Sequence, residues 1–198
     1  MGAIFQSLGR TVAAGVVLLV VIIGLVGAMA GGVAVSMQHA WMAFLFRWLH
    51  VLSAVMWVGL LWYFNFVQIP SMPKIPDEQK PAVSKVIAPT ALFWFRWAAL
   101  ATMVTGLILA GMNGYLGALG TFARPHTAIA IGMWLGLIMG LNVWVIIWPN
   151  QKKALGLVQV EAAEKAAAAH LAMLASRFNT MLSIPMLYCM VAQQNGGL

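Results

Sequence analysis

Residues 42–68 read MAFLFRWLHVLSAVMWVGLLWYFNFVQ, a run in which Arg47 is the one Lys, Arg, Asp or Glu. A helix of about 20 apolar residues spans the hydrocarbon core of a bilayer. This stretch is therefore long and apolar enough to cross a membrane as a helix. Its cation and its histidine, His50, are the residues whose presence inside such a span needs a physical explanation.

The whole chain has the composition of a polytopic membrane protein. Of its 198 residues, 63% are hydrophobic and 8% are charged, against about 25% charged in soluble domains. Four further apolar runs predict helices over 11–35, 91–113, 127–148 and 168–192. We therefore predict an all-α integral membrane fold with five transmembrane helices, in a single domain over residues 1–198. The run at 11–35 is interpreted as a retained signal-anchor helix, followed by a short loop to residue 41.

The distribution of lysines and arginines predicts the orientation. With five spans, one side of the membrane receives Arg10 and every lysine, whereas the other side receives Arg124. Because loop cations gather in the cytoplasm, we expect a cytoplasmic N-terminus and a periplasmic C-terminus in a bacterial inner membrane. The net charge of +7 then reflects topology and anionic lipid, and not nucleic-acid binding. Segment 69–90, with five prolines and several charges, is expected to be an aqueous loop.

His50 is the best candidate for a cofactor ligand. Arg47, His50, Ala54 and Trp57 fall on one face of a helix. The small side chain of Ala54 leaves room for a flat macrocycle, so His50 is predicted to ligate the iron of haem b, with Arg47 near a propionate. The single cysteine excludes covalent haem attachment through Cys-x-x-Cys-His. The alternatives are a hydrogen-bonding core histidine and an Arg47 that reaches the headgroups.

A second iron ligand is expected at a matching depth. His126 opens the helix at 127–148 on the same side as His50, and Arg124 precedes it as a partner for the other propionate. A histidine at a helix start is also commonly just solvated, so this assignment stays open. His170 is interpreted as interfacial or as part of a second site with Arg96, and His39 as exposed.

Further polar residues lie within the spans without any carboxylate. Arg96 and Arg177 could bind an anion, whereas Asn142 and Asn179 could line a polar cavity or form hydrogen bonds between helices, the more usual role. The methionines are interpreted as core filling, since no ligand cluster accompanies them. A ridge of small residues at Ala128, Gly132, Gly136 and Gly140 predicts close helix packing.

Four blocks of sequence resemble the membrane domain of the cytochrome c-linked bacterial urate oxidases: RWLHVLSAVMWVGLLWYFNFVQ, LFWFRWAALATMVTG, GMWLGLIMGLNVWVIIWPNQKK and ASRFNTMLSIPMLYCM. The similarity extends over about residues 42–192. The resemblance implies a membrane redox module that oxidises urate and passes electrons to a fused cytochrome c. The chain has fewer predicted spans than the family's membrane domain and no covalent haem motif, which implies another polypeptide or the quinone pool as acceptor. The blocks carry Arg47, His50, Arg96, Asn142, Arg177 and Asn179.

Three functions follow as hypotheses. The first is a haem b-binding electron-transfer protein, within or beside a larger membrane enzyme and paired with a membrane-protein or cytochrome partner. The second is a membrane oxidase of urate or a similar planar anion, held by Arg96, Arg177, Asn179 and Asn142. The third is a redox-silent accessory subunit that binds lipid and partner helices. Each is compatible with a homo-oligomer.

Overall fold

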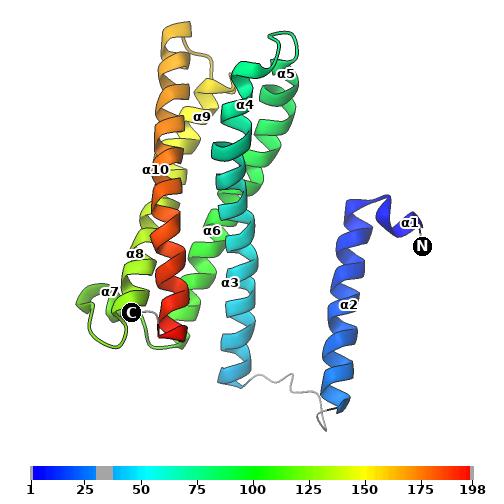
Figure 1. Cartoon of the computed structure of the whole chain (residues 1–198), viewed down its shortest axis with the longest axis vertical. Helices are drawn as coiled ribbons and strands as arrows, with labels where there is room; N and C mark the ends of the chain where they lie inside the picture. The colour runs from blue at the N-terminus through cyan, green and yellow to red at the C-terminus, as the bar shows by residue number, and fades with distance from the viewer. Residues whose placement is uncertain (1, 30–37, 197–198) are drawn as a thin grey trace. The chain divides into compact units, whose positions relative to one another are not determined.

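The computed structural model describes residues 2–29 and 38–196, and nearly all of them are helical (Figure 1). The chain divides into two compact units, with the boundary in the sequence between residues 42 and 43. The all-α fold predicted from the sequence is thereby confirmed.

The first unit contains α1 (Gly2–Phe5) and α2 (Leu8–Met29). The buried residue of α2 is Gly27, and its apolar side chains are otherwise exposed or half-exposed. A helix that is apolar all round is suited to contact lipid. The last residues of the predicted first span, 30–35, lie outside the described residues.

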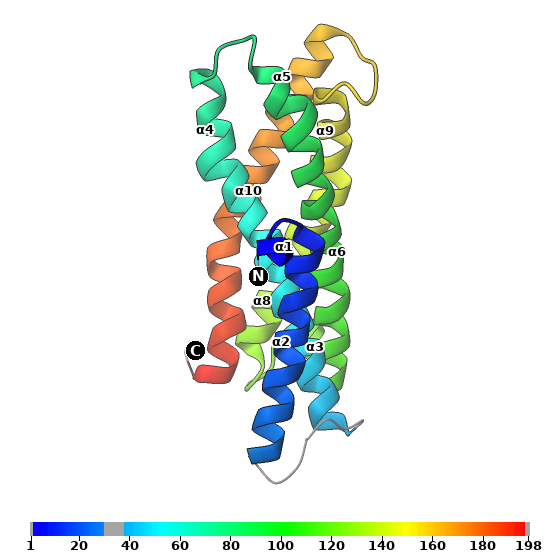
Figure 2. The ribbon, with the colours of Figure 1, turned by 90° about the vertical axis from the view of Figure 1, so that its right-hand side faces the viewer.

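The second unit is a bundle built from three composite helices and one long one (Figures 1 and 2). The first composite runs from α3 (His39–Trp62) through η1 (Tyr63–Gln68) and α4 (Ile69–Ser71) to η2 (Met72–Lys74). The second comprises α5 (Lys80–Ala82), η3 (Val83–Ile87) and α6 (Ala88–Met112). After the short α7 (Ala118–Thr121), the third comprises α8 (Thr127–Asn142), η4 (Val143–Ile147) and α9 (Trp148–Ala154), and α10 (Ala162–Asn195) completes the bundle.

Prolines explain the π-helical turns inside the three composite helices. The turns η1, η3 and η4 end two residues before Pro70, Pro89 and Pro149, respectively. Proline has no N–H to donate, and its ring collides with the carbonyl one turn earlier. Widening that turn to π geometry accommodates the ring without ending the helix. Segment 69–90 is therefore helical except for 75–79, contrary to the expected loop.

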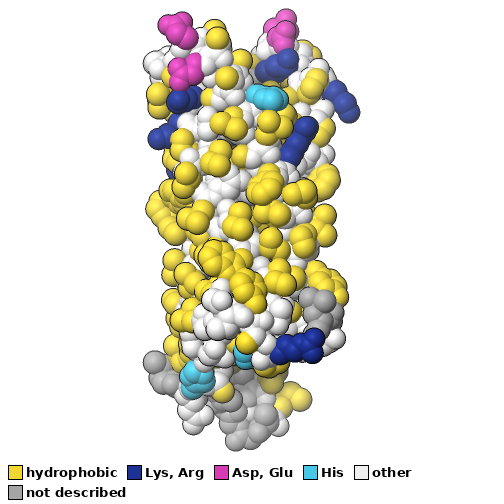
Figure 3. Space-filling view, turned by 90° about the vertical axis from the view of Figure 1, so that its left-hand side faces the viewer, with side chains coloured by type: hydrophobic (Ala, Val, Ile, Leu, Met, Phe, Trp, Pro, Cys, Tyr) yellow, Lys and Arg dark blue, Asp and Glu magenta, His cyan; other side chains and the backbone are white. Residues whose placement is uncertain are grey.

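Four helices of the described part are long and apolar enough to cross a membrane, namely Leu8–Met29, His39–Lys74, Lys80–Met112 and Thr127–Ala154. α10 is not among them, because polar side chains lower its apolarity. Three of these, Ser176, Asn179 and Ser183, are buried against the other helices. Figure 3 shows a broad hydrophobic band across the middle of the bundle, with the acidic and most of the basic side chains at one end and a further basic side chain near the other.

The core of the bundle lies where α3, α6, α8 and α10 approach one another. Trp57, Leu61, Phe95 and Met139 are each at most 1% exposed. The predicted glycine ridge packs closely against its neighbours: a Cβ built on Gly132 would lie 3.2 Å from the Cβ of Cys189. The small residues therefore serve close packing, as predicted.

Candidate functional site

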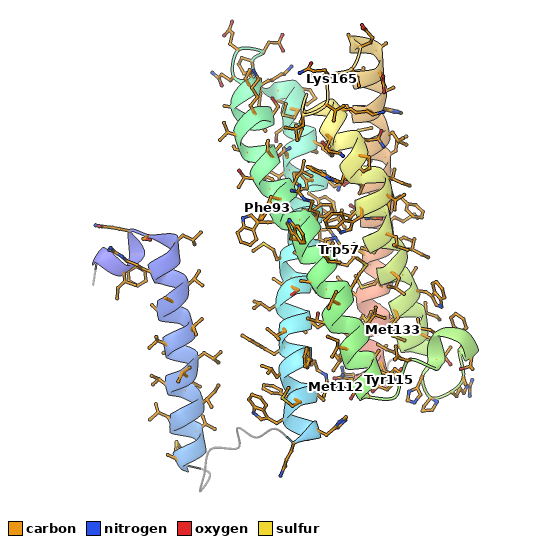
Figure 4. All side chains as sticks on the ribbon, turned by 180° about the vertical axis from the view of Figure 1, so that it is seen from behind. Trp57, Phe93, Met112, Tyr115, Met133 and Lys165 are labelled. Carbon is orange, nitrogen blue, oxygen red and sulfur yellow. The ribbon has the colours of Figure 1, made fainter. Side chains whose placement is uncertain are left out.

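A cavity of about 620 Å³ opens among α3, α6, α8 and α10. Most of its wall is apolar, and Trp57, Met133 and Tyr115, all labelled in Figure 4, line it from α3, α8 and the connection after α6. Polar side chains gather where the helices end, at Arg47, Asn113, Tyr115, Gln193, Gln194 and Asn195. The cavity is therefore amphipathic, with an apolar body and a polar rim, and its size suits an organic ligand or cofactor.

His50 lines the cavity in a defined orientation. Its Nδ1 lies 2.9 Å from the carbonyl oxygen of Thr102 and 3.4 Å from Oγ1 of Thr105. A carbonyl can only accept a hydrogen bond, so Nδ1 carries the proton and donates it, while Nε2 keeps its lone pair. Metal-ligating histidines are commonly oriented by such a bond from the other ring nitrogen.

Gly106 makes room for this imidazole. A Cβ built on Gly106 would lie 2.8 Å from Cε1 and 3.0 Å from Nδ1 of His50. Even an alanine at this position would collide with the ring. The sequence analysis missed Gly106, because nothing in the linear sequence shows that it faces a histidine from another helix.

Arg47 lies one helical turn from His50 and also lines the cavity. Its Nε is enclosed by protein and has no hydrogen-bond partner. The four acidic residues lie far from it, in the 75–79 connection and at the start of α10, whereas the end of α10 lines the cavity. No carboxylate side chain of the described residues therefore pairs with Arg47, and an anionic group of a ligand would satisfy it.

The two tryptophans of the cavity differ in their bonding. Nε1 of Trp62 donates to Oγ of Ser183 at 3.0 Å, whereas Nε1 of Trp57 is buried without a partner. Trp57, predicted from the sequence to share the face of His50, thus lines the same cavity. Four methionines, Met103, Met133, Met186 and Met190, contribute thioethers to the wall. A thioether is an established ligand of haem iron opposite histidine.

His126 lies outside the cavity wall. Its ring packs on Tyr115 with centroids 4.9 Å apart, and its Nδ1 lies 3.4 Å from Nε2 of Gln193. Because Tyr115 and Gln193 both line the cavity, His126 lies behind the wall that they form. Arg124 is exposed and does not line the cavity.

The residues predicted to hold a planar anion, namely Arg96, Arg177, Asn179 and Asn142, do not line the cavity that contains His50. Arg96 holds its guanidinium 3.8 Å from the ring centroid of Trp148, a cation–π contact. Arg177 is exposed, and neither arginine lines the cavity that contains His50. His170 and His39 are exposed as well.

The two asparagines instead join α8 to α10. Nδ2 of Asn142 donates to Oδ1 of Asn179 at 2.7 Å and to the carbonyl of Ala175 at 3.0 Å. Nδ2 of Asn179 donates in turn to the carbonyl of Met139 at 3.0 Å. With Asn179 at 0% exposure, these amides act between helices, the role that the sequence analysis considered the more usual one.

The chain was compared with protein families, curated proteins and solved structures. The family described as urate oxidase N-terminal matches residues 116–196, a range that includes His126, Asn142, Arg177 and Asn179. No curated protein and no solved structure matches the chain. Two of the four sequence blocks lie in the matched range, so the resemblance is confirmed over residues 116–196, which match the urate oxidase N-terminal family.

Proposed function

We propose that this chain is an integral protein of a bacterial inner membrane, with α10 as its fifth span, a cytoplasmic N-terminus and a periplasmic C-terminus. Four apolar helices support the multi-pass arrangement. α10 is long enough to cross the same bilayer. Its buried polar side chains find partners inside the bundle, which lowers their cost in lipid. The gathering of lysines at one end supports the orientation.

We propose further that the cavity holds haem b with His50 as an iron ligand, in a membrane electron-transfer protein. One observation carries this proposal: the Nδ1 bond to Thr102 leaves the Nε2 lone pair of a cavity-lining histidine available. When bound, haem b would supply reversible one-electron oxidation and reduction. The chain would bind and orient the group and exclude water from it.

The residues of the cavity fit such a group. The unpartnered Nε of Arg47 suits a propionate at the polar rim. Gly106 has no side chain that would push the His50 imidazole out of its position at the cavity. His126 stays our proposal for the second iron ligand, and it would require Tyr115 to move aside. The methionine thioethers of the cavity are the alternative second ligands. Arg124 would pair with the second propionate only after a similar rearrangement.

The test is an absorption spectrum of protein purified from haem-replete cells. We expect a Soret band and α and β bands that appear on reduction. His50→Ala should abolish the signal, whereas His39→Ala, which changes an exposed histidine, should preserve it. Protein without a Soret band, or equal haem in both variants, would refute the proposal. Native mass spectrometry of haem-free protein with bound lipid and partner helices would then favour an accessory subunit.

The family match favours a second function, oxidation of urate or a similar planar anion, with electrons passed to a membrane-protein or cytochrome partner. The anion would need a guanidinium, since arginine both pairs with and stacks on delocalised anions. Among the arginines of the described chain, Arg47 is the one that lines this cavity. Urate-dependent reduction of an added acceptor, lost in Arg47→Gln, would support this function. No reduction across a panel of purines would exclude it.

A further inference from the structure

A second, smaller cavity of about 290 Å³ lies at the other end of the bundle. Its walls come from the proline-widened turns η1, η3 and η4, together with α6, α9 and α10. It includes Met72 near the end of the first composite helix and Leu155 just after the third. It shares no lining residue with the larger cavity, so it is a separate site.

The lining of this second cavity is neutral. It contains no Lys, Arg, His, Asp or Glu, and its polar members are Gln68, Ser84, Gln151 and Ser176. Oγ of Ser84 donates to the carbonyl of Lys80 at 3.1 Å, and Oγ of Ser176 accepts from Nδ2 of Asn65 at 2.8 Å. Oε1 of Gln68 is enclosed by protein and has no donor. An enclosed oxygen without a donor is unfavourable, which favours a ligand that donates a hydrogen bond to it.

Neutral amides restrict the chemistry of that ligand. A charged molecule would enter without a counter-charge, at a high desolvation cost. A primary amide offers both a donor and an acceptor, so it can pair with a carbonyl oxygen or with a hydroxyl. The volume suits one ring, and the edge-to-face pair Phe64 and Phe95, with centroids 5.7 Å apart, contributes an aromatic wall.

A quinone has these properties in both redox states. The quinone ring is neutral and presents carbonyl oxygens that Nε2 of an amide can donate to. The hydroquinone is also neutral and presents hydroxyl groups that Oε1 of Gln68 can accept from. An isoprenoid tail would remain among the apolar side chains or in lipid. We propose that this second cavity binds the ring of a membrane quinone, with Gln68 as its principal hydrogen-bonding residue and Gln151 as a second amide in the lining.

The test uses the full chain in lipid nanodiscs, photolabelled with an azidoquinone and competed with ubiquinone-1. Peptide mass spectrometry should place the label in the helices that bear Gln68, Ser84 or Ala172. Gln68→Leu keeps the size of the side chain but removes its polar atoms, so ubiquinone-1 should compete about tenfold less well, the equivalent of one lost hydrogen bond to an enclosed partner. Gln79→Leu is the matched control, because it changes an exposed glutamine at the same end of the bundle, and should leave competition unchanged.

A third variant separates binding in the cavity from adsorption. Ala169 is exposed and lies at the cavity wall, so Ala169→Phe should reduce the space without disturbing the core, and labelling should fall. The proposal would be overturned if ubiquinone-1 competed equally well with labelling of the Gln68→Leu and Gln79→Leu variants. It would also be overturned if the label spread along lipid-facing surfaces, or if an alkyl alcohol without a ring competed as well as ubiquinone-1. The experiment needs no haem, so its outcome is independent of the larger cavity.

Discussion

Replacing Gly106 with alanine tests whether the larger cavity depends on a fixed imidazole. The new Cβ would lie 2.8 Å from Cε1 of His50, whereas ordinary contacts begin at 3.4 Å, so the ring must retreat by about 0.6 Å. The same retreat can lengthen the Nδ1 bond to Thr102 from 2.9 Å to at most about 3.5 Å, at which a hydrogen bond is effectively lost. Overpacking of this kind costs roughly 1–3 kcal/mol, and the broken bond adds roughly 1 kcal/mol.

Two assays follow Gly106→Ala. Thermal unfolding in detergent should show a loss of stability of that size, and haem content per protein, read from the Soret band, should fall. Gly59→Ala is the control, because Gly59 lines the same cavity but a Cβ there meets nothing within 4 Å. If the Gly106 and Gly59 variants retained equal haem and equal stability, the argument that Gly106 positions His50 would be refuted.

Three further predictions concern other parts of the bundle. Asn142→Leu should destabilise the protein by roughly 2–4 kcal/mol in thermal unfolding, because it leaves the enclosed amide of Asn179 without its donor and adds a branched side chain. Arg47→Gln should lower the midpoint potential of the haem proposed for the larger cavity in a spectroelectrochemical titration, since a positive charge beside such a group favours its electron-rich state. Lys80→Gln should raise the pKa of Asp77, followed by NMR, because the Lys80 hydrogen bond and charge lower that pKa in the native protein.

The interaction between Asp77 and Lys80 should contribute to stability in one pH range only. Because folding lowers the pKa of Asp77, its interaction with Lys80 stabilises the protein above the ordinary value of 3.8, and this contribution is lost as the pH falls through the lowered pKa. Lys80→Gln should therefore weaken stability at neutral pH slightly and have no effect in strong acid. An unchanged titration of Asp77 would contradict the assignment.

Residues outside the buried core provide controls for the other two variants. Asn150 is half-buried with its amide bonded to the carbonyl of Ile146 in its own helix, so Asn150→Leu should cost far less stability than Asn142→Leu. Arg124 is exposed outside the cavity, so Arg124→Gln should shift the midpoint potential less than Arg47→Gln. A larger shift with Arg124→Gln would instead support its predicted pairing with a propionate.

The apolar runs of the sequence predicted the helices because every turn of a helix that faces lipid carries apolar side chains. Pro70 and Pro89 led to the prediction of a loop, since the linear sequence does not show that a π-helical turn accommodates each proline within a helix. Face periodicity placed Arg47, His50 and Trp57 together, and all three line one cavity. It could not find Gly106 or the position of His126 behind Tyr115, because both depend on how separate helices are packed.

The polar residues that lower the apolarity of α10 are the residues that join it to the other helices of the bundle. Ser176, Asn179 and Ser183 are buried, and each bonds to a side chain from another helix. A helix that faces lipid on one side only can carry such residues inward, since its partners satisfy them. Between the two cavities the same interface closes into a core in which Leu61 and Met139 are at 0% exposure. A diffusing molecule would therefore have to open this packing to pass from one cavity to the other, so the two proposed sites would exchange their ligands separately.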